Sequence, residues 1–126
     1  MAAIKRDKRD IAFSRYIRAR DGWRCQRCGT YYPEDRRQGL DCAHFYGRRN
    51  KGVRWDPDNA VALDRGCHQY FGEHPDQFKA FMFARLGEAR YNALALKAKK
   101  VTKFTRDELE WVHQDIKRQL AELEGA

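Results

Sequence analysis

Apolar runs are short in this sequence, and none approaches the roughly 20 residues that a membrane-spanning helix needs. Residues 1–8 are charged and lack the apolar stretch of a secretory signal peptide. Proline is scarce, with three residues, and the chain contains no low-complexity tract and no internal repeat. We therefore expect one folded domain of 126 residues that resides in the cytoplasm.

Cysteine is also sparse, with residues at positions 25, 28, 42 and 67. In a reducing cytoplasm, cysteines bind metal more often than they form disulfides. Cys25-x-x-Cys28 is typical of a zinc knuckle, in which two thiolates on a tight turn bind one Zn²⁺ in adjacent tetrahedral positions. Cys67 is a good third ligand, but Asp64 stands where a second pair would have another cysteine. Asp64 or Cys42 could complete the site; we favour Asp64, and a chain that has lost the zinc is the alternative.

Negative charge is in the minority, since 26 Lys and Arg face 18 Asp and Glu and give a net charge of +8. Such a balance suggests a polyanionic partner, because neutralised phosphates supply most non-specific nucleic-acid affinity. Residues 5–27 carry nine Lys or Arg against three Asp, and residues 36–54 carry six against one. Residues 107–124 are acidic instead. The basic surface therefore belongs to the segments that carry the candidate site.

Apolar spacing and turn residues predict helices and strands in mixed order, which places the chain in the α+β class. Helices are expected over about 10–20, 64–72, 75–86, 88–98 and 105–124, and strands over 40–45 and 53–55. The last helix opens with a capping box, Thr105-x-x-Glu108. Its apolar stripe is formed by Leu109, Val112, Ile116, Leu120 and Leu123. We expect this stripe to pack within the molecule rather than to form a dimer seam.

The most informative polar residues lie between and beside the cysteines: Asp41, His44, Asn59 and His68. Together they could hold one divalent ion next to a histidine base, which is what phosphodiester hydrolysis needs. His44 is the candidate base, because an imidazole with a pKa near 6.5 accepts a proton from water at neutral pH. An ideal strand turns residues 41 and 44 to opposite faces, so a shared role requires a twist, bulge or turn there.

The ordered combination of these residues resembles the motif of HNH endonucleases, which are built on a ββα-metal scaffold. The combination consists of Cys25-x-x-Cys28, Asp41-x-x-His44, Asn59 and Cys67-His68. Residues 41–50 and 53–59 are similar to phage recombination nucleases of the NinG/Rap type, and the resemblance covers residues 14–98. It implies a basic N-terminal helix in 1–22, a small HNH core in 23–74 and a helical extension in 75–126.

The resemblance also implies roles for the polar residues. Asp41 would be the first ligand of a catalytic Mg²⁺ or Mn²⁺, and His68 the second, with His74 ranked below it. A nitrogen ligand leaves Ni²⁺ and Zn²⁺ open as well. Asn59 would bridge the loop between the strands and hold the backbone around His44, or it is a plain turn residue.

Basic residues follow the candidate base closely and could contact phosphates: Arg48, Arg49, Lys51 and Arg54. Tyr46 and Trp55 could stack on bases or pack inside the fold. We expect a DNA endonuclease of phage or prophage recombination, working in a bacterial host cell alone, as a homodimer, or with recombination or packaging proteins. The rival hypothesis is a zinc-ribbon DNA-binding module without catalysis, which needs no Asp41, His44 or His68.

Overall fold

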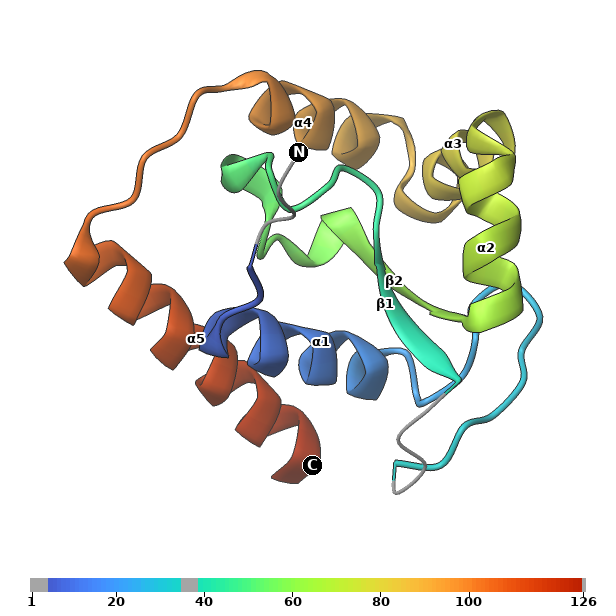
Figure 1. Cartoon of the computed structure of the whole chain (residues 1–126), viewed down its shortest axis with the longest axis horizontal. Coiled ribbons are helices and arrows are strands. Elements are labelled where there is room, and N and C mark those ends of the chain that lie inside the picture. The colour runs from blue at the N-terminus through green and yellow to red at the C-terminus, as the bar shows by residue number, and fades with distance from the viewer. Residues whose placement is uncertain (1–4, 35–38, 126) are drawn as a thin grey trace.

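A computed structural model describes residues 5–34 and 39–125 of the chain (Figure 1). Within these ranges it contains helices α1 (Lys8–Arg20), α2 (Arg65–Glu73), α3 (Pro75–Leu86), α4 (Glu88–Lys99) and α5 (Arg106–Gly125), and strands β1 (Leu40–His44) and β2 (Ala60–Asp64). Short 3₁₀ turns lie at Lys51–Val53 and Pro57–Asn59. The α+β class is confirmed. Residues 1–4 of the expected N-terminal helix and 35–38 of the loop before β1 lie outside the described ranges.

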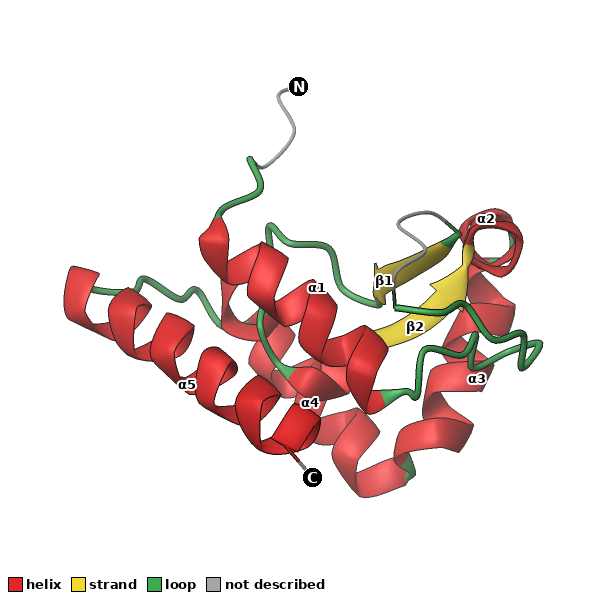
Figure 2. Ribbon diagram, turned by 90° about the horizontal axis from the view of Figure 1, so that it is seen from below, coloured by secondary structure: helices red, strands yellow, loops and turns green. Residues whose placement is uncertain are grey.

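Helix α1 begins and ends at residues that suit a helix terminus. The Asp7 side chain accepts hydrogen bonds from the amides of Arg9 and Asp10, and the Asp10 side chain accepts one from the Asp7 amide, which makes a capping box. After the helix, Gly22 has a φ of 69° and turns the chain away. The buried side chains of α1 face β1 and β2 on one side and α5 on the other, so α1 lies between them (Figure 2).

The two strands form one antiparallel ladder whose register runs without interruption from Leu40 opposite Asp64 to His44 opposite Ala60. The expectation of a second strand over 53–55 is wrong, because Val53 ends a 3₁₀ turn and the partner of β1 is β2. Residues 60–63 are all buried, so β2 shows no polar–apolar alternation to reveal it as a strand. The side chain of Asn59 bonds the backbone of Val53 and thereby holds that segment as a loop.

The remaining helices confirm the expected segments, with shifted ends at some of them. Asp64 caps α2 by accepting a hydrogen bond from the Cys67 amide. Pro75 opens α3 and Gly87, with a φ of 81°, ends it. The Thr105–Glu108 capping box is present at the start of α5, with both of its hydrogen bonds formed.

Two buried clusters hold these elements together. The larger joins the sheet to α2, α3 and α4; the smaller consists of Phe13, Ile17, Ala60 and Ile116, with Val112 packed against it. Ile116 and Val112 of the expected α5 stripe thus pack against α1 inside the molecule, whereas Leu123, at its end, is exposed. No helix in the described part of the chain is long and apolar enough to span a membrane.

Candidate functional site

Three cysteine thiols and one carboxylate converge beside the end of the sheet. The ligand atoms of Cys25, Cys28, Asp64 and Cys67 all lie within 4.8 Å of one another. The Cys28 thiol donates to Asp64 Oδ2 at 2.9 Å, and a bridge between Arg24 and Tyr31 closes the turn that carries both knuckle cysteines. This group could hold a metal ion, as expected for these residues.

The surroundings of Cys25 suit a thiolate. Burial alone would raise its pKa, but backbone amides of Asp64, Cys28 and Arg27 donate hydrogen bonds to the sulfur, and the net pKa is lowered. At Cys67, burial raises the pKa to about 12, although the Arg27 guanidinium lies 3.5 Å from the sulfur and opposes that shift. A coordinated ion removes the proton of a thiol outright.

Cys42, the alternative fourth ligand, is not part of this group. Its side chain packs against the smaller core cluster, on the α1 side of β1, and burial raises its pKa to about 12. The fourth position of the cluster is therefore occupied by Asp64, which also caps α2. Zinc ligands about 2.3 Å from the ion place neighbouring sulfurs about 3.8 Å apart, so the group needs to contract by roughly 1 Å at most.

A second pair of ligand-type side chains meets on the other side of the strand–helix junction. His68 Nδ1 lies 3.0 Å from Asp41 Oδ2, and Arg65 lies 3.6 Å from Asp41 Oδ1. Two ligand atoms that occupy adjacent octahedral positions about 2.1 Å from an ion are about 3.0 Å apart. The observed separation of Asp41 and His68 therefore fits one divalent ion.

His44 lies at the end of β1, with its ring against Phe13 of α1. The ring donates a hydrogen bond to the backbone of Arg54, and Nε2 is buried with no hydrogen-bond partner among the described residues. Burial lowers its pKa, and the positive charge of Arg48 lowers it further. The imidazole is therefore neutral at pH 7, with one nitrogen fixed and the other available as an acceptor.

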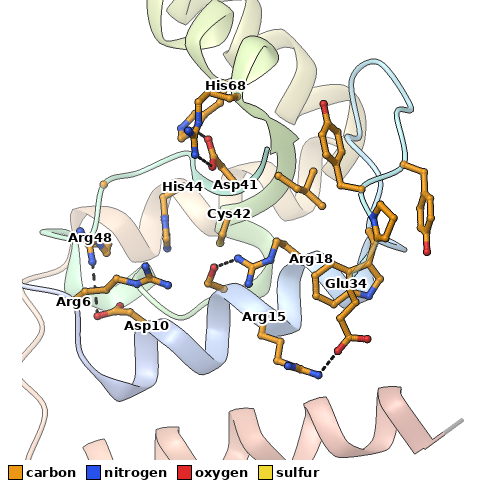
Figure 3. Close-up of a pocket in the computed structure, with 18 residues that line it drawn as sticks. Arg6, Asp10, Arg15, Arg18, Glu34, Asp41, Cys42, His44, Arg48 and His68 are labelled. Carbon is orange, nitrogen blue, oxygen red and sulfur yellow. Dashed lines mark hydrogen bonds and ion pairs between the residues drawn. The ribbon is translucent and has the colours of Figure 1, made fainter. Parts of the chain in front are cut away.

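The ladder around Asp41 and His44 contains no bulge, although we expected that a shared role would need a twist, bulge or turn. Asp41 extends toward α2 and His44 toward α1 (Figure 3). Both nevertheless line one open cleft of about 1340 Å³ together with His68. The cleft wraps around the exposed side of β1, so side chains that leave the strand in different directions reach the same space.

Asn59 is fully buried and bridges the loop between the strands. Its Nδ2 donates to the carbonyl oxygens of Tyr46 and Val53 at 2.8 and 3.1 Å, and its Oδ1 accepts from the Tyr46 amide at 2.8 Å. The amide thereby fixes the chain two residues after His44. This is the bridging contact expected for Asn59.

The four basic residues of the loop lie in different environments. Arg54 is buried, and its guanidinium bonds both carboxylate oxygens of Asp10 at 3.0 and 2.5 Å, so it is not open to a phosphate in this structure. Arg48 lines the cleft, 3.9 Å from Asp10. Arg49 and Lys51 are exposed.

The aromatic side chains of this region pack within the fold. Trp55 donates to Asp10 and lies against Phe104, and Tyr46 packs on Phe45. His74 is bonded to the Tyr70 carbonyl at the far end of α2 and does not line the cleft in the described structure.

The sequence did not reveal that α1 forms a wall of this cleft. Arg6, Arg15 and Arg18 line it from α1 and the segment before it, and Arg65 lines it from α2. The high density of basic residues in 5–27 was the available signal for the first three, but only the packing of α1 on β1 brings them close to His44.

Comparison with models of known protein families, with curated proteins and with solved structures finds no match to this chain. What is established is therefore the class: an α+β protein with a four-residue group that could hold a metal ion.

Proposed function

We propose that this chain is a metal-dependent endonuclease of the HNH type that hydrolyses phosphodiester bonds of DNA, in phage or prophage recombination or processing. The observation that supports it most strongly is the pairing of Asp41 with His68 at 3.0 Å in a cleft that also contains His44. These residues come from two separate stretches of sequence, strand β1 and helix α2. A purely structural role for any one of them gives no reason for all three to border one open space.

In this proposal His44 is the general base. Its bonded nitrogen is held by the Arg54 backbone, which orients the ring, and Nε2 takes the proton of a water molecule as that water attacks phosphorus. The new bond joins the water oxygen to phosphorus, and the bond from phosphorus to the leaving sugar oxygen breaks. Asn59 keeps the loop after His44 in place.

Asp41 and His68 would hold the catalytic ion, for which a carboxylate oxygen and an imidazole nitrogen suit Mg²⁺ or Mn²⁺, and also Ni²⁺ or Zn²⁺. When bound there, such an ion stabilises the negative charge that develops on the phosphoryl and leaving oxygens. Arg65 and Arg48 line the same cleft and can bind the phosphate.

Zinc is the ion we propose for the group formed by Cys25, Cys28, Asp64 and Cys67. Three thiolates and one carboxylate suit tetrahedral zinc, and a site closed by four protein ligands is typical of a structural role. In that role the ion joins the turn after α1 to the start of α2.

Cleavage of supercoiled plasmid tests the proposal, with wild type and His44→Ala compared in Mg²⁺, in Mn²⁺ and without added ion. We expect ion-dependent nicking by the wild type and a loss of about 10²- to 10⁴-fold in His44→Ala. Circular dichroism should show that the variant is folded. Equal cleavage by a folded His44→Ala protein, or none by the wild type with any ion, contradicts the proposal.

One observation favours a second candidate, a metal-stabilised DNA-binding module without catalysis. The Nε2 atom of His44 is buried rather than open to the solvent of the cleft. DNA binding that persists without cleavage under every ion would support this candidate.

A further inference from the structure

The wall of the cleft formed by α1 carries positive charge that the proposed chemistry does not use. Arg6 and Arg18 line this cleft below the Asp41–His68 pair, whereas Arg15 points away from β1 toward Glu34 (Figure 3). The three side chains differ in how far their charge is already neutralised by the protein.

Arg18 combines partial burial of its charge with the lack of a neutralising carboxylate among the described residues. It is half-buried, and its guanidinium donates to Ser14 Oγ through Nη1 and lies 5.7 Å from the centre of the Trp23 ring. Among the described residues no carboxylate lies within ion-pair distance of it. Burial lowers the pKa of Arg18, and the like charges of Arg6 and Arg15 lower it further. Its Nε and Nη2 groups therefore remain available as donors.

Arg15 offers a contrast on the same helix. It forms ion pairs with Glu34 and with Glu124, the latter at 2.7 Å, so its charge is already neutralised. Arg6, by comparison, has no ion pair with any of the described residues. Asp41 is an acid that favours the charged form of Arg18, but a metal ion bound to Asp41 would offset that attraction.

We propose that Arg18, with Arg6 beside it, forms a phosphate-binding subsite on the α1 wall, which holds a DNA backbone phosphate other than the one at Asp41 and His68. The inference rests on the proposed function in that the anion is DNA. A guanidinium with free donors matches the oxygens of a phosphate, and partial burial strengthens that attraction. The subsite would extend DNA contact beyond the loop of 47–54 onto the N-terminal helix.

The test is the salt dependence of DNA binding, measured by fluorescence anisotropy with a labelled oligonucleotide in a His44→Ala background that prevents cleavage. Arg18→Met keeps the aliphatic stem over Trp23 and removes the charge. We expect the slope of log affinity against log salt concentration to fall by roughly 0.7 to 0.9 in Arg18→Met, which corresponds to one lost phosphate contact. Arg18→Lys should restore most of the slope. Arg15→Met, the matched control, should leave the slope unchanged.

An unchanged slope in a folded Arg18→Met protein, or a change equal to that of Arg15→Met, overturns the subsite. A merely structural role would lower the melting temperature of Arg18→Met without altering its slope. Inorganic phosphate serves as a second probe. If it raises the melting temperature of the wild type but not of Arg18→Met while the DNA slope is unchanged, the site binds free phosphate and the proposal is wrong.

The outcomes separate this inference from the nuclease. A reduced slope in Arg18→Met together with no plasmid cleavage by the wild type retains the subsite and rejects the endonuclease. Plasmid cleavage by the wild type together with an unchanged slope in Arg18→Met retains the endonuclease and rejects the subsite. No DNA binding by the parent protein rejects both.

Discussion

The cysteine group and the Asp41–His68 pair flank the same strand–helix junction. They differ in how many protein ligands each brings together and in how exposed those side chains are. The first brings four ligand-type residues together, with Cys25 and Cys67 buried. The second has two, and they are open, with the His68 side chain 43% exposed and the Asp41 side chain 27% exposed. Structural metal sites are closed by protein ligands, whereas catalytic sites leave positions for water and substrate. Under the proposed function, this difference suits a stabilising role for the cysteine group and a chemical role for the Asp41–His68 pair.

Cys67 and His68 are neighbours in the sequence, and one belongs to the cysteine group and the other to the Asp41–His68 pair. They occupy the first turn of α2, where successive side chains point about 100° apart, so one faces the cysteine group and the other the cleft. One short helix therefore contributes a side chain to each of the two groups. Substitutions at these neighbours should have opposite consequences.

The largest effect is expected from Cys67→Ser. Removing one ligand should abolish metal binding at the cysteine group, and structural zinc contributes on the order of 10 kcal/mol, as much as the whole stability of a small domain. Thermal unfolding followed by circular dichroism should lose its cooperative transition, and elemental analysis should show loss of zinc. Cys42→Ser, outside the group, should retain the metal. A Cys67→Ser protein that keeps both metal and melting curve would show that the group is no metal site.

His68→Ala should have the reverse phenotype. The loss of one ligand of the proposed catalytic ion should reduce plasmid nicking by about 10²- to 10³-fold, since such an ion contributes several kcal/mol to the transition state. Zinc content should not change, and the free energy of unfolding should stay within about 1 kcal/mol because His68 is partly exposed. Nicking at the wild-type rate would remove His68 from the site.

Asp10→Asn should weaken the contact between α1 and the loop after β1, where Asp10 bonds Arg54. Burial raises the pKa of Asp10, but hydrogen bonds from Arg54 and the Asp7 amide outweigh it, so the net pKa is lowered. The substitution removes the carboxylate bonded to the buried Arg54 and leaves Asp7 3.9 Å from it, which should decrease the free energy of unfolding by about 3 to 5 kcal/mol at pH 7. Urea denaturation measures this.

The pH dependence supplies a check on Asp10→Asn. Because the folded-state pKa of Asp10 is lowered, its contribution is present above the ordinary value of 3.8 and is lost as the pH falls through the folded-state pKa. The difference between wild type and Asp10→Asn should therefore narrow in acid. Asp115→Asn, at an exposed pair with Arg118, should lower stability by less than about 1 kcal/mol.

The smallest expected effect is a displacement of the pH profile of cleavage. Because the pKa of His44 is lowered, the base is neutral at pH 7 and the acid limb of the rate profile should lie below pH 6.5. Burial is the main cause and the charge of Arg48 a further one. Arg48→Gln should therefore move the limb to higher pH, whereas Lys51→Gln should leave it in place. A limb that does not respond to Arg48→Gln belongs to another group.

Local signals in the sequence predicted the helices well. Capping residues such as Thr105 and Glu108, and the stop at Gly87, act within one turn of chain and can be read directly. The second strand could not be identified in this way. The unbroken apolar run of residues 60–63 is compatible with a strand or with part of a buried helix. Residues 53–55 alternate between apolar and polar types as a strand does, but in the structure Arg54 is buried beside Asp10.

The cysteine group was predictable because ligand spacing carries its own signal, and the structure supports Asp64 rather than Cys42 as its fourth member. The assignment of Asp41, His44 and His68 to catalysis remains a prediction. The role of α1 was not predictable, since Asp10 and Arg54 are 44 residues apart and nothing local in the sequence joins them.

The packing of α5 on α1 has a consequence for synthesis. Lys8 bonds Glu110, and Arg15 bonds Glu124, so contacts span 102 and 109 residues along the chain. Chains emerge from the ribosome N-terminus first, and closing so long a loop is entropically slow. Phe13 and Ile17 therefore leave the ribosome about a hundred residues ahead of Ile116, and the smaller core is completed only once α5 has been made.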